Sequence, residues 1–185
     1  GVNYYDGQGF IVRKSLGVKS AKELDGASIC IQTGTTTELN LADFFRMNGM
    51  KYEAVPIETN SEARTAYLAT RCDSYTTDAS GLYGSRVTFP NPDDHMILPE
   101  IISKEPLGPA VRQGDDQWAD IIRWVFNATV AAEELGVTSS NVDSMKNSTN
   151  PEIKRLLGVE GSQGEELGLS KDWAYQVIKK IGNYG

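Results

Sequence analysis

The sequence predicts an α/β fold in which a doubly wound, mostly parallel sheet is followed by a helical C-terminal tail. Within the first 105 residues, short β-rich runs alternate with helical patterns, which favours a parallel sheet with helices on both faces. Beyond residue 109 the patterns are almost wholly helical. The hydrophobic content of 39% in 185 residues is enough for a buried core.

The elements of the first part follow one another closely. Gly26 and Gly49 end helical segments, and Pro90 and Pro92 interrupt the chain after the last of them. Strands are expected over residues 10–13, 28–32, 52–57, 72–77 and 96–102, and helices over residues 20–24, 36–48, 61–69 and 79–87.

The tail begins with a short strand-like run at residues 110–112 and a long helix over residues 117–135. Further helices are expected over residues 141–146, 151–157 and 170–181. The long helix carries apolar residues at helical spacing, which predicts one buried stripe: Trp118, Ile121, Ile122, Val125, Ala128, Ala132 and Leu135. This stripe needs a partner, so either the tail folds back on the α/β part or the chain is a piece of something larger.

Charge excludes several classes of partner. Lys plus Arg number 18 against 25 for Asp plus Glu, a net charge of −7, which argues against a nucleic-acid or anionic-membrane surface. The apolar runs fall short of the roughly 20 residues that cross a bilayer. The first residues lack the basic start and apolar core of a signal peptide.

The first motif is Gln32-Thr33-Gly34-Thr35-Thr36-Thr37-Glu38, between a strand and a helix. Thr35 and Glu38 have the spacing of a capping box, which predicts that the helix begins there. A helix start presents unpaired N–H groups and about half a positive charge, so the glycine and short hydroxyl side chains at Thr35, Thr36 and Thr37 would let a carboxylate or phosphate approach. The alternative is an ordinary helix cap.

The second motif is Tyr75-Thr76-Thr77-Asp78-Ala79-Ser80-Gly81, where another strand ends in an acid at a helix entry. Open α/β sheets bind ligands at such strand ends. Amides at the first motif and a carboxylate at Asp78 would together suit a small zwitterion, with a carboxylate for the amides and an ammonium for Asp78. An aspartate that only caps its helix is the alternative.

Cys30 and Cys72 fall on the strands that precede these two motifs. If the strands are parallel neighbours, the thiols meet, and a disulfide would close 42 residues (72 minus 30) and stabilise the fold by about 4 kcal/mol. A disulfide would indicate an oxidising compartment, whereas two buried free thiols are common in the cytosol.

Features that would support catalysis or a metal are weak. The single histidine, His95, lies in an acidic segment and is expected to be a solvated loop residue. One histidine with two cysteines argues against zinc, no phosphate-binding glycine loop occurs, and Asp115 and Asp116 are expected to favour a helix start. Trp118, Trp124 and Trp173 are expected in the core. We therefore expect no catalytic residue, metal or cofactor.

Several segments give the chain a family resemblance: Val2-Asn3-Tyr4-Tyr5-Asp6-Gly7-Gln8-Gly9-Phe10, Arg71-Cys72-Asp73, the two motifs above, and the run from Ile101 to Asp115 that contains Lys104-Glu105-Pro106-Leu107-Gly108-Pro109. In these the chain resembles periplasmic amino-acid-binding proteins of bacterial ABC importers, and most of all the subgroup that binds a broad range of L-amino acids. In that family two α/β lobes, joined by two crossing segments, close over the amino acid.

The resemblance implies an organisation. Residues 1–9 would form the first crossing segment, residues 10–105 the second α/β lobe of the type II periplasmic-binding-protein kind, residues 106–111 the second crossing, and residues 112–185 the mostly helical C-terminal part of the first lobe. The elements that open the first lobe, with the family's carboxylate-gripping arginine and aromatic platform, have no counterpart in this sequence.

The resemblance also implies a site and a function. Thr35, Thr36 and Thr37 would hold the ligand carboxylate, Asp78 the ammonium, and Asn60 and Ser61 the ligand side chain. The protein would capture L-amino acids in the periplasm and deliver them to an inner-membrane ABC permease, without itself being embedded in the membrane and without binding nucleic acid. The alternatives are an amino-acid-sensing domain of a receptor or regulator, and an enzyme similar to cyclohexadienyl dehydratase, for which Asp78 lacks a clear acid–base partner.

Overall fold

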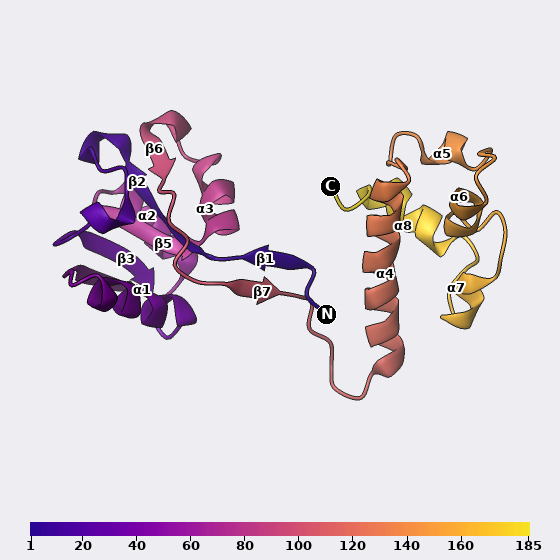
Figure 1. Ribbon diagram of the computed structural model, residues 1–185, viewed down its shortest axis with the longest axis horizontal. Helices are drawn as coiled ribbons and strands as arrows, with labels where there is room; N and C mark the ends of the chain where they lie inside the picture. The colour runs from indigo at the N-terminus through magenta and orange to yellow at the C-terminus, as the bar shows by residue number, and fades with distance from the viewer. The chain divides into compact units, whose positions relative to one another are not determined.

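The strands of the first half form a five-stranded sheet in a computed structural model, which describes residues 1–185. The strand order is β4-β3-β5-β2-β6 (Figure 1). Strand β3 pairs in parallel with β4 and β5, and β2 pairs antiparallel with β5 and β6, so only β2 runs against the others. This confirms the mostly parallel α/β sheet. The strands are β2 (Gln8–Arg13), β3 (Ser28–Gln32), β4 (Glu53–Ile57), β5 (Ser74–Asp78) and β6 (His95–Ile97).

Helices cover both faces of the sheet, because alternate strand residues point to opposite sides. Phe10 and Ile29 pack with Phe45 of α1 (Thr36–Met47) in one cluster. Ile11 and Cys30 pack in the other cluster with residues of α2 (Asn60–Leu68) and α3 (Ala79–Arg86). Strands buried on both faces read as continuous apolar runs in the sequence, as Phe10 to Val12 and Ile29 to Ile31 do.

A disulfide joins Cys30 of β3 to Cys72, which lies just before β5. The two Cα atoms are 5.7 Å apart, and both residues are buried among the residues of the α2 and α3 face. The predicted pairing is therefore confirmed, and it follows from the parallel pairing of β3 with β5.

A two-stranded ribbon carries the chain into and out of the sheet unit. Strand β1 (Tyr4–Asp6) pairs antiparallel with β7 (Glu105–Leu107), with Asp6 opposite Glu105. Gly7 follows β1 at a close approach: a Cβ there would lie 2.3 Å from Ile101 Cγ2 and 2.6 Å from the Ser103 carbonyl oxygen. A side chain at this position would therefore force the two passing segments apart.

Two strand predictions were wrong in this region. The strand expected over residues 96–102 ends at Ile97, and the one expected over residues 110–112 is absent, while β1 and β7 form instead. A strand forms where another backbone offers a ladder of hydrogen bonds. Residues 110–112 are exposed and belong to no strand, whereas Glu105 to Leu107 find such a partner in β1.

The chain divides into two compact units, residues 2–107 and residues 108–185, with Gly1 grouped with the second. The second unit is helical, and its core includes Ala132, Val137 and Ile178. Its helices are α4 (Asp116–Glu134), α5 (Val142–Met145), α6 (Pro151–Leu156), α7 (Gln163–Glu166) and α8 (Trp173–Ile181). The sequence patterns predicted all of these except α7, and placed the start of α8 three residues too early.

The apolar stripe of α4 is buried along only part of its length, so the prediction of one continuous buried stripe was wrong. Ala128 and Ala132, in the C-terminal half, are buried. In the N-terminal half Trp118 is 49% exposed and Trp124 is 50% exposed, so these two tryptophans are not core residues of this unit, and Trp173 is only half-buried. The buried apolar cluster that contains Ala132 includes no residue from positions 116–125 of α4.

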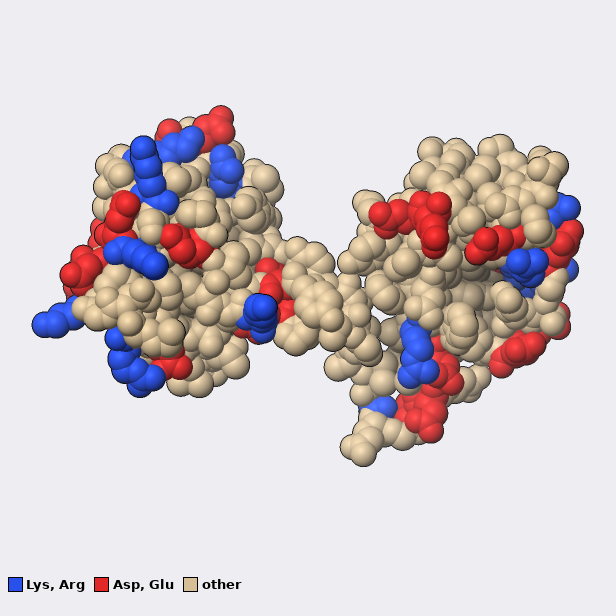
Figure 2. Space-filling model, in the orientation of Figure 1, with Lys and Arg blue, Asp and Glu red and all other residues tan.

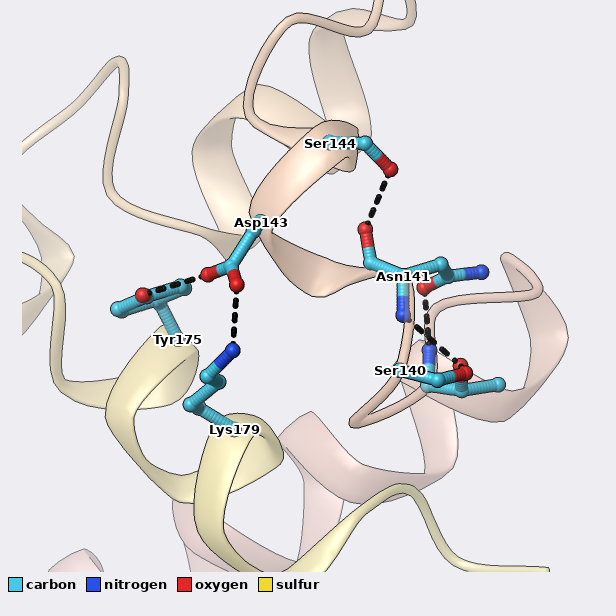
Figure 3. Close-up of polar contacts among 7 residues, drawn as sticks. Ser140, Asn141, Asp143, Ser144, Tyr175 and Lys179 are labelled. Carbon is cyan, nitrogen blue, oxygen red and sulfur yellow. Dashed lines mark hydrogen bonds and ion pairs between the residues drawn. The ribbon is translucent and has the colours of Figure 1, made fainter.

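Polar contacts at the surface tie α5 to α8 (Figure 3). Asp143 of α5 accepts a hydrogen bond from Tyr175 Oη at 2.8 Å and forms an ion pair with Lys179, and both partners belong to α8. In the same region Asn141 Oδ1 accepts from the Thr138 N–H at 2.7 Å and so fixes the turn before α5. These contacts are solvent-exposed, and exposed pairs of this kind contribute about 1 kcal/mol or less each.

Acidic and basic side chains are mixed on the face of each unit that Figure 2 shows, with no continuous basic surface there. None of the helices combines the length and the apolar character of a membrane span.

Candidate functional site

The first motif forms the predicted helix start, but its hydrogen bonds differ from a capping box. Gly34 takes the left-handed conformation, with φ of 71°, and Thr35 is the N-cap of α1. The Thr35 hydroxyl donates to the Gln32 carbonyl at 2.9 Å instead of accepting from the helix. Glu38 reaches back to the Gly34 N–H at 2.9 Å, one residue before the N–H that a capping box would use. The helix position was correct and the cap chemistry was not.

This arrangement leaves the helix start open to an anion. The backbone N–H groups of Thr35, Thr36 and Thr37 donate to no oxygen of the protein. They carry the positive end of the dipole of α1, which has twelve residues. The motif lies at the end of β3, where the carboxyl edge of the sheet begins.

Asp78 ends β5 and stands at the N-cap of α3, yet its carboxylate makes no capping hydrogen bond. Asp6 of β1 takes that role: its carboxylate accepts from the Ser80 N–H at 3.3 Å and from the Ser80 hydroxyl. Gly7 adds a second contact at the same helix start, because its carbonyl accepts from the Ala79 N–H at 2.8 Å. The Asp78 carboxylate therefore has no partner in the protein.

The surroundings of Asp78 favour a cation beside it. Burial raises the pKa of Asp78, and the nearby carboxylates of Asp6 and Glu105 raise it further. Burial acts the same way on Asp6, but hydrogen bonds from Ser80 and from the backbone bring the Asp6 pKa below its usual value. An ammonium group next to Asp78 would relieve the repulsion among the three acids.

Asp78 faces a cavity of about 300 Å³ at the carboxyl edge of the sheet. Tyr75 donates its hydroxyl to Asn60 Oδ1 at 3.0 Å across this cavity wall, linking β5 to the start of α2. The lining is polar, and it includes Asn60, Ser61, Arg64, Tyr75, Thr77 and Asp78.

The structure brings three of the predicted site residues together and places the other three at the neighbouring strand end. Asn60, Ser61 and Asp78 line one cavity. Thr35, Thr36 and Thr37 lie at the end of β3, which is the parallel neighbour of β5, so both strand ends reach the same edge of the sheet.

Sequence reasoning missed two residues at this edge, Gln8 and Arg64. Gln8 is fully buried and lies opposite Asp78 in the β2–β5 pairing. Its Nε2 donates to the Thr37 carbonyl at 3.1 Å and to the Thr76 hydroxyl at 2.9 Å, so one side chain contacts both motifs. An amide between two glycines at a strand start was a signal for a special position, but its partners were not readable from the sequence.

The other candidates have structural roles. His95 is only 7% exposed and its Nδ1 lies 2.7 Å from the Tyr67 hydroxyl, so the expectation of a solvated loop histidine was wrong. The acidic residues beside it in the sequence stay outside while β6 carries the ring inward. Asp115 caps α4 by accepting from the Trp118 N–H at 3.1 Å. No group of three or more His, Cys, Asp or Glu side chains in residues 1–185 is arranged to hold a metal.

Comparison with curated proteins finds close relatives along the whole chain, although no family model matches it. It is 64% identical to the general L-amino acid-binding periplasmic protein AapJ of Rhizobium johnstonii, over 100% of this chain and 54% of the relative. It is 63% identical to the glutamate/glutamine/aspartate/asparagine-binding protein BztA of Rhodobacter capsulatus, over 100% and 55%. It is 51% identical to the putative amino-acid ABC transporter-binding protein YhdW of Escherichia coli, over 100% and 54%. The chain thus spans about half the length of these relatives.

Solved structures agree with the fold. An ABC transporter periplasmic binding protein from Brucella ovis, with glutathione bound, superposes with a TM-score of 0.93 at 59% identity, over 100% of this chain and 59% of that one. An ancestral arginine-binding protein bound to arginine matches with a TM-score of 0.53 at 27% identity, over 65% of this chain and 53% of that one.

Proposed function

We propose that this chain, a homologue of periplasmic amino-acid-binding proteins of ABC transporters, provides one ligand-gripping lobe of a protein that captures L-amino acids in the periplasm. The captured amino acid would pass to an ABC permease in the inner membrane. The observation that carries the proposal is the unpartnered Asp78 carboxylate, which stands one strand away from the open helix start at Thr35.

The two features are complementary to the poles of an amino acid. The α-carboxylate would accept hydrogen bonds from the N–H groups at Thr35, Thr36 and Thr37, and the α-ammonium would pair with Asp78. Burying either charge without a partner costs several kcal/mol, so a site with both partners selects ligands that carry both poles. Asn60 and Ser61 would contact the ligand side chain, since they line the same cavity as Asp78.

The ligands for which the relatives are named support a site that recognises the α-amino and α-carboxylate groups common to all amino acids. AapJ is named for general L-amino acids, and the Brucella ovis protein holds glutathione. Glutathione begins with a γ-glutamyl residue whose α-amino and α-carboxylate groups are both free. A site that binds these two groups would therefore accept both free amino acids and a γ-glutamyl peptide.

The lobe would close against a second lobe. We propose residues 1–9 and 106–111 as the two crossing segments and residues 10–105 as the lobe that carries Asp78. The ribbon of β1 and β7 supports this, because it consists of two antiparallel passes of the chain at the border of the sheet unit. Residues 112–185 would belong to the first lobe, and the remainder of that lobe would cover the exposed Trp118 and Trp124 of α4.

We propose binding, and not catalysis, for this site. Asp78 has two further carboxylates nearby, Asp6 and Glu105, and no His, Cys or Lys lines the cavity to act as a base beside its serine hydroxyls. His95 is engaged by Tyr67 and lines a different cavity with Arg13 and Pro90. The curated relatives are also named as binding proteins.

Titration calorimetry of the full-length protein against a panel of L-amino acids tests the proposal. A dissociation constant near 1 μM corresponds to about −8 kcal/mol and is the kind of affinity that capture requires. Asp78→Ala should weaken binding by about 2–5 kcal/mol, because it removes one side of a buried charge pair. Asp93→Ala, at a fully exposed acid of the same unit, is the matched control and should leave the affinity unchanged. No binding of any amino acid by the wild type, or a loss below about 0.5 kcal/mol in Asp78→Ala, would contradict the proposal.

A further inference from the structure

The ligand cavity contains a second unpartnered charge, the guanidinium of Arg64. Arg64 is half-buried on α2 and lines the same cavity as Asp78. It forms no hydrogen bond and no ion pair with a protein group, whereas three other arginines of this unit do. Arg13 donates to the Tyr67 and Cys72 carbonyls, Arg46 pairs with Asp43, and Arg86 donates to the Pro92 carbonyl.

Arg64 is held on the side of α2 that faces the cavity. It lies four residues after Asn60, and residues at this spacing share one face of a helix. Asn60 accepts the Tyr75 hydroxyl at 3.0 Å, which turns this face toward β5. Burial is the main cause of the raised pKa of Tyr75, and the charge of Asp78 raises this pKa further. A hydrogen bond with Thr77 and the charge of Arg64 act in the opposite direction and lower the pKa. Tyr75 therefore lies within electrostatic range of both Arg64 and Asp78.

We propose that Arg64 binds a second carboxylate, carried by the side chain of the ligand, so that the site prefers dicarboxylic L-amino acids such as glutamate and aspartate. This inference rests on the proposed function, in which Asp78 takes the ammonium and the start of α1 takes the α-carboxylate. The cavity of about 300 Å³ suits a ligand of this size.

The preference follows from what each ligand leaves unpaired. A guanidinium binds a carboxylate through two parallel hydrogen bonds, which makes the pair strong and directional. An amide side chain offers a single neutral acceptor to the same group. With an apolar ligand side chain, the half-buried guanidinium of Arg64 would be further desolvated without gaining a hydrogen-bond acceptor, and this desolvation weakens binding. We therefore expect the order acidic, then amide, then apolar side chains.

The decisive experiment measures the dissociation constants of L-glutamate and L-glutamine, which have nearly the same shape, for the full-length wild type and for Arg64→Gln. Wild type should bind glutamate more tightly than glutamine by about tenfold or more, and Arg64→Gln should bring the two constants to within about threefold of each other. Arg64→Lys keeps the charge and should retain a preference for glutamate. Arg46→Gln removes an equal charge from an exposed position and should leave the ratio unchanged.

Other outcomes separate the possible failures. If Arg64→Gln weakens glutamate and glutamine equally, Arg64 contacts the α-carboxylate or has a structural role, and the proposal is wrong. An unchanged ratio in a variant with wild-type melting temperature overturns it as well, and so does a wild type that binds both ligands equally. Binding of other amino acids in these cases would leave the proposed function intact. Should no amino acid bind to the wild type, the proposed function fails together with this inference.

Discussion

The side-chain amide of Gln8 donates a hydrogen bond of 3.1 Å to the carbonyl of Thr37. The same Nε2 donates to the Thr76 hydroxyl at 2.9 Å, and that hydroxyl donates to the Gly9 carbonyl at 2.7 Å. Gln8 is fully buried, and its Oε1 accepts no hydrogen bond from the protein. One side chain from β2 thus fixes the start of α1 relative to the strand that carries Asp78.

Replacing Gln8 by alanine should destabilise the protein by about 1–3 kcal/mol, because two acceptors lose a buried donor. Urea denaturation of the full-length protein measures this change. Gln32→Ala is the matched control, since its side chain donates to the Glu58 carbonyl at the surface and its loss should change stability by about 0.5 kcal/mol or less. Equal effects of the two substitutions would contradict the role assigned to Gln8.

Asp78→Asn should raise the melting temperature of the ligand-free protein by about 1–3 °C at neutral pH while it weakens amino-acid binding. The carboxylate is partly desolvated beside Asp6 and Glu105, and it makes no capping hydrogen bond that the substitution could remove. Burial and the two acids raise the pKa of Asp78 in the folded state, so its ionised form opposes folding above that pKa.

The advantage of Asp78→Asn should therefore shrink as the pH falls through the raised pKa of Asp78, where the wild type takes up a proton. Differential scanning calorimetry between neutral pH and pH 4 follows this change. A variant that is less stable than the wild type at neutral pH would show that the carboxylate has a stabilising partner.

Reduction of the Cys30–Cys72 disulfide should destabilise the protein by up to about 4 kcal/mol, since a loop of 42 residues is then free in the unfolded chain. Denaturation with and without a reductant measures the difference. A Cys30→Ala/Cys72→Ala variant should match the reduced wild type and should not respond to the reductant. A response of the double variant would point to a different effect of the reductant.

Stability should fall when the pH is lowered from about 6.5, the usual pKa of histidine, because His95 resists protonation in the folded state. Burial lowers its pKa, and Arg13 and Arg86 add to this against the opposing charge of Asp94. Tyr67, whose own pKa is raised by burial, keeps its proton and can donate to Nδ1 only while His95 is neutral.

His95→Gln should make stability nearly independent of pH between 6.5 and 5, apart from the contribution of the carboxylates. Denaturation midpoints of both proteins across this range test the assignment. Parallel slopes in the two proteins would place the pH dependence elsewhere.

From the sequence alone it was possible to predict most strands and helices of the sheet unit, including the two strand ends at Thr35 and Asp78, but not β1 and β7. Strand 28–32 has the predicted bounds, and the helix expected over residues 36–48 ends one residue earlier. Alternating strands and helices favour a parallel pairing, and if β3 and β5 were parallel neighbours, the disulfide and the common edge of Thr35 and Asp78 were expected; the structure has this pairing. These are properties of local periodicity and of chain connectivity, so they are visible in the sequence.

The partners of the side chains at that edge could be identified only in the folded protein. Asp6 caps α3 in place of Asp78, Gln8 joins the two motifs, and Arg64 stands in the cavity without an acceptor. The contacts of Asp6 and Gln8 join segments that are far apart in the chain, and the role of Arg64 depends on its having no acceptor. Neither property is visible in a local sequence pattern. The burial of His95 and the exposure of Trp118 have the same cause, because the neighbours of a side chain are set by packing between elements and not by the residues beside it in sequence.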